Sequence, residues 1–312
     1  MNDPPGGLAR PSGAKCSFFG LSVGYFGEPR LSLDDSQLIL HQRQAHETHP
    51  FLFDLKSGVG NWLTSEASVD YSAVWSPDSL QIAYSSNQNG QWNLFLRPAS
   101  GQGSPTLVGE SPNQQIPGSW TRNGNLLAFV ERIPASAEMD IWLQPMDAMN
   151  AKPTPFLNTP EVREVQPRFS LDGNWLAYAS DKEKQFEIFI HEVVREGGKV
   201  VPGRYKKVSK DGGWEPVWSH DGKELFYRSK DGKRLLSSAI DTAGSLSVGE
   251  ERTVLPELPS PEPNLHFSAC YDVSNDNQKF LILTEIKKPA MTRLILVQNW
   301  FEEIKRIASA GK

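Results

Sequence analysis

Apolar residues in this chain come in short runs, and in several runs they alternate with polar residues. Leu94 and Leu96 flank a single residue, and so do Ile188 and Ile190. A period of two is typical of β-strands, because successive side chains point to opposite faces. Clusters of Gly, Pro, Asn, Asp and Ser separate the runs and favour turns. The pattern therefore predicts an all-β chain, with a short helical tail only within residues 301–312.

One nine-residue pattern occurs six times along the chain. A hydroxyl residue comes first, Asp or Asn follows two positions later, and an apolar strand ends the pattern. The copies begin 44 to 55 residues apart, which is close to the length of a four-stranded propeller blade. They are Ser32–Leu40, Ser76–Tyr84, Thr121–Phe129, Ser170–Tyr178, Ser219–Tyr227 and Ser274–Ile282.

The third and fourth positions of each copy predict a tight turn between two strands. An Asp or Asn side chain can accept hydrogen bonds from nearby backbone N–H groups, and Gly accepts a positive φ without a steric clash. Asp172-Gly173 and Asp221-Gly222 fit this description best. Asp34-Asp35 and Asp78-Ser79 depart from Gly, so we expect slight strain or another turn there.

Each copy also predicts its flanking strands. The residue before the hydroxyl is bulky, and we expect it to pack between blades rather than to stack on a ligand. These residues are Leu31, Trp75, Trp120, Phe169, Trp218 and Val273. Third strands are predicted at 50–55, 92–98, 140–146, 187–193, 235–241 and 293–300, and fourth strands at 61–65, 154–159 and 205–210.

The sequence thus predicts a six-bladed β-propeller with four-stranded antiparallel blades over residues 16–300. Residues 1–15 are expected to form a disordered lead and residues 301–312 a tail. The last repeat supplies only three strands before the chain ends. Residues 19–25 alternate like a strand, so they are a candidate for the missing strand, which would remove an open sheet edge.

Composition limits the classes of function. The hydrophobic fraction of 38% supports a folded core, and the formal net charge of −5 argues against nucleic-acid binding. No stretch approaches 18 apolar residues, so no membrane span is predicted. The first 15 residues lack the apolar core of a secretory signal. Cys16 and Cys270 have no zinc-site spacing, and the sequence leaves open whether they form a disulfide.

The repeats resemble those of the TolB-like, WD40-like propeller family. The resemblance is carried by "WSPDSLQIAYSS", "FSLDGNWLAYASD", "EPVWSHDGKELFYRSKDGK" and "LILVQNWFEEIK", and it covers about residues 24–307. It is strongest to the propeller that follows the kinase domain and membrane helix of certain bacterial serine/threonine protein kinases. The resemblance implies a periplasmic location. The chain has no Gly-rich phosphate loop, "HRD" or "DFG", so kinase activity is not implied.

Two short motifs invite a chemical interpretation. "GLSVG" at 20–24 matches a nucleophile elbow, but Ser22 lies in a strand-like pattern without the helix that an elbow needs. "HQRQAHETH" at 41–49 contains three of the six histidines. Its spacing is not that of His-Glu-x-x-His, so we expect a solvated loop rather than a metal site.

Carboxylates recur just before the predicted first strands. In a propeller, the loops that lead into these strands gather at one mouth of the central channel, so an acidic ring could bind a cation or a basic peptide. Ordinary loop charge explains the same residues. The candidate ligand-binding residues are Glu28, Asp70, Glu164 and Glu215, with Gln115 and Trp214 at similar positions.

The first functional hypothesis is a non-catalytic scaffold that presents its channel mouth to a protein, peptide or saccharide. It has no predicted cofactor, and we expect a monomer. The alternative is a metal-dependent hydrolase or lyase at the central channel, with Ca²⁺ as the candidate ion. A third possibility is the remnant sensor domain of a receptor-type kinase.

Overall fold

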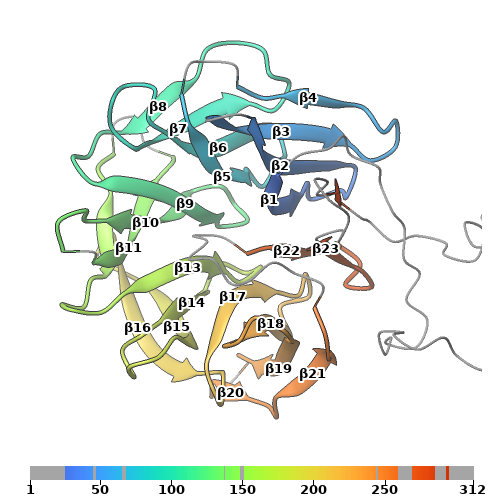
Figure 1. Ribbon diagram of the computed structural model, residues 1–312. Helices are drawn as coiled ribbons and strands as arrows, with labels where there is room; N and C mark the ends of the chain where they lie inside the picture. Colours follow the sequence, from blue (N-terminus) through green and yellow to red (C-terminus); the bar gives the residue numbers. More distant parts are fainter. Residues whose placement is uncertain are drawn as a thin grey trace, which may run out of the picture.

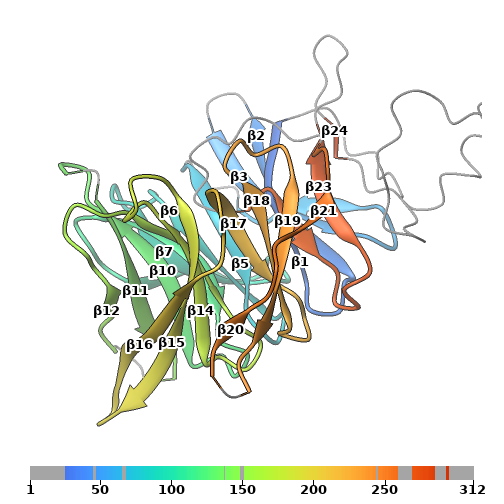
Figure 2. The same cartoon turned by 90° about the horizontal axis from the view of Figure 1, so that it is seen from below.

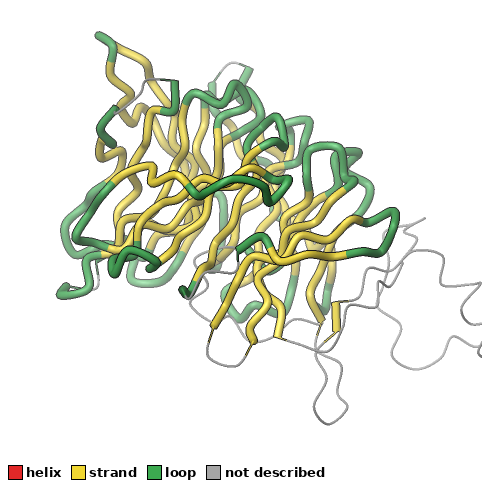
Figure 3. Tube along the Cα trace, turned by 90° about the horizontal axis from the view of Figure 1, so that it is seen from above, coloured by secondary structure: helices red, strands yellow, loops and turns green. Residues whose placement is uncertain are grey.

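The strands of this protein form a ring of small antiparallel sheets around a central axis (Figure 1). The computed structural model describes residues 25–44, 47–64, 68–136, 138–147, 151–243, 245–258, 269–284 and 293–294. These residues form strands, turns and loops without an α-helix (Figure 3). None of them therefore forms a helix that could cross a membrane.

Four sheets have four strands each, in the order of the chain. The first contains β1 (Tyr25–Leu31), β2 (Gln37–Gln44), β3 (Glu47–Asp54) and β4 (Gly60–Trp62). The second contains β5 (Asp70–Trp75), β6 (Gln81–Ser86), β7 (Asn93–Pro98) and β8 (Thr106–Gly109). The third contains β9 (Gln114–Trp120), β10 (Leu126–Arg132), β11 (Met139–Pro145) and β12 (Thr154–Leu157). The fourth contains β13 (Glu164–Phe169), β14 (Trp175–Ser180), β15 (Glu187–Glu196) and β16 (Lys199–Lys207).

The last two sheets differ in size. The fifth contains β17 (Gly213–Trp218), β18 (Glu224–Ser229), β19 (Leu235–Asp241) and β20 (Ser247–Val248), and β21 (Arg252–Leu255) also pairs with β19. The sixth contains β22 (Tyr271–Val273), β23 (Phe280–Thr284) and β24 (Arg293–Leu294). The fold is an all-β propeller, and five of its blades are complete within the described residues.

The first strand of each sheet lies nearest the axis, and the later strands lie progressively outward (Figure 1). Neighbouring inner strands contact one another in the order β22, β1, β5, β9, β13 and β17. Seen edge-on, the sheets run between the two faces of the ring (Figure 2). The face that carries the six nonamer turns is called the turn face below.

Every nonamer is a turn between the first and second strands of its sheet, as predicted. In all six, the hydroxyl donates to the Asp or Asn two residues later, at 2.5–2.8 Å. It also accepts the N–H of the residue five positions later. The fourth position has a positive φ in every copy, including non-glycine Asp35, Ser79 and Asn277. The predicted strain at Asp35 and Ser79 is confirmed, and their turn has the same geometry as the glycine turns.

The three non-glycine turns carry contacts between neighbouring sheets. The Asp35 carboxylate accepts the Asn275 N–H at 2.9 Å, and the Ser79 hydroxyl accepts the Leu33 N–H at 3.2 Å. The Asn277 side-chain oxygen accepts the His220 N–H at 2.6 Å. These bonds join the fifth sheet to the sixth, the sixth to the first and the first to the second. At these three seams, the position with positive φ holds a residue whose side chain bonds to the neighbouring sheet, in place of glycine.

The bulky residues before the hydroxyls pack between blades, as predicted. Trp218 is buried with residues of the fourth and fifth sheets, and Leu31 packs with residues of the first and sixth. The indole N–H of Trp218 donates to the Arg168 carbonyl at 3.0 Å, and that of Trp75 donates to the Arg30 carbonyl at 3.0 Å. Each of these two indoles thus adds a polar bond to an apolar interblade contact.

Four inner strands contain a β-bulge at the same position, four residues before the hydroxyl. Glu28, Ser72, Gln166 and Glu215 have φ values of 52°, 55°, 59° and 61°. The pairing with the second strand shifts register around each of them. A bulge bends a strand and re-aims its side chains. The residues before and after each bulge therefore pair with the second strand in different registers.

Several predictions fall on residues outside the described part of the chain. These are the disordered lead at 1–15, Cys16, Ser22, most of the candidate closing strand at 19–25, and the helical tail at 301–312. Cys270 lies within the described residues and is a buried free thiol.

The seam bond of Asp35 leads to a testable prediction. Glycine normally relieves a left-handed residue by about 1 kcal/mol. Asp35→Gly also removes a charge-assisted bond to Asn275, worth about 1.5–3 kcal/mol. We expect a net loss of about 1 kcal/mol in the free energy of unfolding, measured by urea denaturation. The control is Lys184→Gly, because Lys184 has a φ of 71° and is exposed. It should gain about 1 kcal/mol, and equal gains in both variants would contradict the role of the seam bond.

Candidate functional site

The six predicted site residues lie within or at the start of inner strands rather than in loops. Five of them are buried, between 0% and 7% exposed, and Trp214 is partly buried. They occupy two levels of the channel wall. Asp70, Gln115 and Glu164 stand six residues before a hydroxyl, and Glu28 and Glu215 stand four before it. The carboxylates therefore do not form one ring, and their ligand-binding role stays a prediction.

Asp70 is fully buried in a hydrogen-bonded group from the first two blades. Its carboxylate accepts the Thr64 hydroxyl at 2.5 Å and the Ser68 hydroxyl at 2.9 Å, and it lies 3.0 Å from Nδ1 of His49. Three partners satisfy a carboxylate that has no contact with solvent. The arrangement joins β3 and the segment between β4 and β5 to the start of β5.

The histidine-rich stretch is not a solvated loop, so that prediction was wrong. His41 lies in β2 and His49 in β3, and both are buried. Nε2 of His41 accepts the Ala73 N–H at 3.2 Å, and Nδ1 lies 3.4 Å from the Glu28 carboxylate. Burial lowers the pKa of His41. The loop interpretation failed because strands β2 and β3 are longer than the nonamer indicated.

Gln115 and Trp214 are also engaged with the protein. The Gln115 side chain accepts the Leu94 N–H at 3.2 Å, and its carbonyl accepts the Ser85 hydroxyl at 2.6 Å. Trp214 stacks on Phe186 with ring centroids 4.0 Å apart. Both side chains thus join neighbouring blades.

Glu215 connects three sheets. Its carboxylate lies 3.0 Å from the Arg228 guanidinium, and it accepts the Cys270 N–H at 2.8 Å. Its own N–H donates to the Gln166 side chain at 2.8 Å, and its carbonyl accepts the Tyr271 hydroxyl at 2.9 Å. Glu215 and Arg228 are 2% and 1% exposed. Glu215, held in place by Arg228, thus joins the fifth sheet to the fourth and the sixth.

Glu164 has a buried oxygen atom without a hydrogen-bond partner. It is 2% exposed, and its Oε2 atom, like that of Glu28, has no hydrogen-bond partner among the described residues. Burial raises the pKa of Glu164 to about 7, with Asp140 adding to the effect. Burial also raises the pKa of Asp140 to about 6, helped by the charges of Glu138 and Glu131. A carboxyl group with such a pKa can hold or release a proton near neutral pH.

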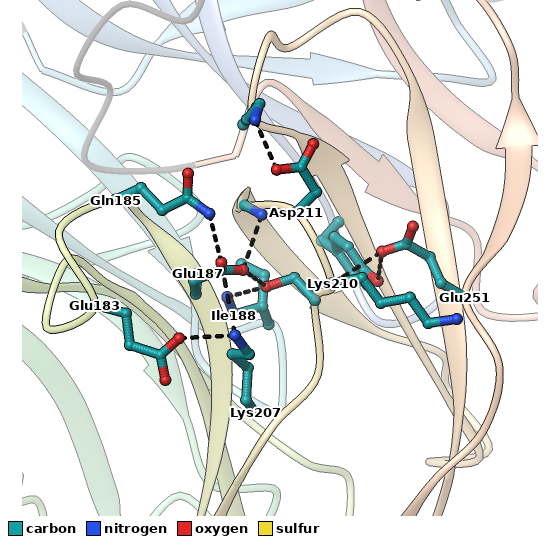
Figure 4. A network of polar contacts seen from close by, with 12 residues as sticks. Glu183, Gln185, Glu187, Ile188, Lys207, Lys210, Asp211 and Glu251 are labelled. Atoms are coloured by element: carbon teal, nitrogen blue, oxygen red, sulfur yellow. Dashed lines mark hydrogen bonds and ion pairs between the residues drawn. The ribbon is translucent and has the colours of Figure 1, made fainter.

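A further carboxylate, that of Glu187 at the start of β15, lies in a network of polar contacts (Figure 4). It accepts the Ser209 hydroxyl at 2.5 Å, the Gly212 N–H at 2.9 Å and the Gln185 amide at 2.7 Å. These bonds hold the segment between β16 and β17, which connects the fourth blade to the fifth, against β15. The basic segment Lys199–Lys207 is the outer strand β16, which overlaps the fourth strand predicted at 205–210, and its side chains are exposed or partly exposed.

The turn face holds a cavity of about 220 Å³ at the end of the channel. All six repeats contribute to its wall. Its charged and titratable lining groups are Arg30, Arg122, Arg168, His220 and Asp272. Val74, Trp75, Trp120, Phe169 and Val217 are among its apolar walls.

The prediction from sequence missed this cavity. The signal was the position two before the hydroxyl, which holds Arg30, Arg168 and Asp272 in three of the repeats. Charged residues inside an otherwise apolar inner strand indicate that these side chains face the channel.

Metal binding has no assembled donor set in the described part of the chain. No group of three or more His, Cys, Asp or Glu side chains there is arranged to hold an ion.

Comparison with known proteins supports the fold. No protein-family model and no curated protein matches the chain. A structure described as TolB from Agrobacterium tumefaciens is 19% identical over 74% of this chain and 80% of its own, with a TM-score of 0.58. TolB from Acinetobacter baumannii is 17% identical over 73% of this chain and 56% of its own, with a TM-score of 0.53. A periplasmic gluconolactonase from Pseudomonas aeruginosa is 14% identical over 72% and 69%, with a TM-score of 0.52. The fold is therefore that of the TolB-like propellers, and enzymes share it.

The contacts of Glu215 predict a structural rather than a ligand-dependent effect of its removal. Glu215→Ala removes the carboxylate that balances the buried Arg228 charge, and breaking such a buried pair costs about 3–5 kcal/mol in the free energy of unfolding. Chemical denaturation measures this loss. Glu192→Ala breaks the exposed pair with Arg204 and should cost less than about 1 kcal/mol. Similar losses in the two variants would contradict the interblade role of Glu215.

The raised pKa of Glu164 predicts a dependence of stability on pH. Between the ordinary value of 4.5 and about 7, the folded protein holds a proton that the unfolded chain has lost. Stability from this group is therefore present at low pH and is lost as pH rises through about 7. Glu164→Gln keeps a neutral side chain at every pH.

We expect Glu164→Gln to raise the free energy of unfolding at pH 8 by on the order of 2 kcal/mol relative to wild type, with little difference at pH 5. Urea denaturation at the two pH values tests this. The control is Glu110→Gln, because Glu110 is exposed. A pH-independent difference would show that Glu164 is ionised in the folded protein.

Proposed function

We propose that this protein is a non-catalytic binding module, with its ligand site at the turn-face end of the channel. The observation that supports the proposal is the cavity of about 220 Å³ to which all six repeats contribute charged or apolar side chains. Ligand sites in proteins are typically concave and apolar, with a few convergent polar groups. A propeller displays such a site on a rigid scaffold.

In this proposal the ring has six blades. Strands β22, β23 and β24 form the inner three strands of the last blade, and they contact β1. Arg30 donates to the carbonyl of Ala269 at 2.9 Å, and the Asp272 carboxylate accepts the Leu31 N–H at 2.9 Å. These bonds support a ring closed between the sixth sheet and the first. The partner is a protein, a peptide or a saccharide.

The resemblance to kinase-linked propellers supports a second part of the proposal. A chain of this kind would serve as the sensing domain of an envelope receptor, on the periplasmic side. The genomic context of the coding sequence tests this part independently of any ligand.

Glu164 is the observation that favours an enzyme as the second candidate. A buried carboxyl group with a pKa near 7 and a free oxygen could act as a general acid or base, and Asp140 lies close enough to influence it. A hydrolase or lyase of this kind would use a divalent ion such as Ca²⁺ at the channel.

A thermal-shift screen separates the two candidates. The binding module predicts a rise in melting temperature with peptides or saccharides but not with Ca²⁺, Mn²⁺ or EDTA. A ligand at one hundred times its Kd adds about 2.7 kcal/mol. For a protein of this size that is a shift of about 4 °C. A metal-dependent shift that Glu164→Gln abolishes, with Glu110→Gln as control, would instead support the enzyme.

A further inference from the structure

The cavity on the turn face gathers positive charge in a protein whose formal net charge is −5. Three guanidinium groups line it, from Arg30, Arg122 and Arg168, against the single carboxylate of Asp272. That carboxylate is already engaged, because it accepts the backbone N–H groups of Leu31 and Val273 at 2.9 and 3.0 Å. The charges of the arginines are therefore not balanced within the cavity by the described residues.

Arg168 is the residue that most needs a partner. Its Nη2 atom is buried and has no hydrogen bond among the described residues. Burial, with the charge of Arg30 acting in the same direction, lowers the pKa of Arg168 to about 9. Arg168 as a whole is partly exposed, but a desolvated charged donor without a hydrogen bond costs folding free energy, and an anionic ligand in the cavity would offset that cost.

Arg30 cannot balance the charge of Arg168, because both side chains are cations. Hydrogen bonds to backbone carbonyls fix the position of Arg30. Its Nη1 atom donates to the carbonyls of Pro29, Ala269 and Tyr271 at 2.6, 2.9 and 3.4 Å. Arg30 is 3% exposed. Two cationic side chains are thus held in the same cavity, one anchored by carbonyl groups and the other with a donor still free.

The rest of the wall indicates what kind of anion fits. Trp75, Trp120, Phe169, Val74 and Val217 give the cavity an apolar surface beside the guanidinium groups. Guanidinium and carboxylate groups match in geometry and can form two parallel hydrogen bonds. A carboxylate on an organic stem satisfies both parts of the wall, whereas a strongly hydrated phosphate ion satisfies only one.

We propose that the turn-face cavity binds a carboxylate carried on an organic stem, with Arg168 as its principal partner and Arg30 as a second positive charge. The proposal rests on the proposed function, because it names the ligand chemistry of the same site. The carboxylate belongs either to a small organic acid or to an acidic side chain of a protein partner.

Arg122 extends the same site toward its rim. It is exposed and also lines a second cavity of about 300 Å³, between the third and fourth blades. Arg195 lies in that second cavity but donates to the Gly173 carbonyl and the Asn174 side chain at 3.2 and 3.4 Å. Arg122 therefore adds long-range attraction for an anion, and its removal should weaken binding less than the removal of Arg168 does.

The experiment compares matched pairs of ligands with and without charge. The full chain is titrated by calorimetry with glutarate and with glutaramide, and with the blocked peptides Ac-Gly-Asp-Gly-NH₂ and Ac-Gly-Asn-Gly-NH₂, at constant ionic strength. Inorganic phosphate is the fifth probe. We expect glutarate or the Asp peptide to bind and both amides to fail. A response to glutarate indicates a small acid, and a response to the peptide alone indicates a protein partner.

Variants assign the binding to the cavity. Arg168→Gln should weaken the binding of the carboxylate at least tenfold, because a hydrogen bond to a charged group is worth about 1.5–3 kcal/mol. Arg122→Gln, at an exposed position, should weaken it by a smaller factor and serves if Arg168→Gln does not fold. Arg204→Gln is the control, since Arg204 lies on β16 and pairs with Glu192.

A second readout does not depend on the ligand. Without an anion, Arg168→Gln should melt at a higher temperature than the wild type, because it removes an unpaired buried charge. A lower melting temperature together with unchanged binding of the carboxylate would overturn the proposal. Equal binding of glutarate and glutaramide would leave the binding module intact and overturn only the role of charge. Absence of binding by all five probes would overturn the carboxylate site, and the broader screen above would then decide the proposed function.

Discussion

The closure of the ring is the constraint on which the rest of this structure depends. Strands along the chain can form separate sheets without closing, but a propeller requires its last sheet to meet its first. Here the meeting is made by side chains that bond to backbone. The Arg30 guanidinium donates to the carbonyl of Ala269, just before the sixth sheet. Across the same seam, Asp272 accepts the Leu31 N–H and Asp35 accepts the Asn275 N–H. Leu281 joins them by packing against the first blade.

The same constraint explains why predicted ligand-binding residues form hydrogen bonds that join neighbouring blades. Inner strands lie close to one another around the axis, so their polar side chains find partners in the next blade. Asp70 and Glu215 are both buried with their oxygens bonded to neighbouring sheets. On the turn face, by contrast, the strands leave a cavity, and Arg168 retains a donor with no partner among the described residues.

Much of the fold could be predicted from the sequence, because its signals are local. The nonamer turns and most third strands followed from Asp, Gly and alternating apolar residues, and five complete blades agree with the predicted repeat. The contacts of the candidate site could not be predicted in the same way. The partners of Glu215, for example, include Cys270, which lies far away in the chain, and Oε2 of Glu164 has no partner among the described residues. The histidines of β2 and β3 were misjudged because burial is decided by the adjacent blade.

The bulged position of the inner strands has a consequence for how this propeller can vary over time. Glu28, Ser72, Gln166 and Glu215 all have left-handed backbone, which β-branched side chains adopt at a high cost. Substitution at these positions is thus limited by the backbone, and at Gln166 and Glu215 also by the hydrogen bonds that their side chains make. Four of the six repeats therefore restrict this position to residue types that tolerate a positive φ, whereas the outer strands carry no such backbone restriction.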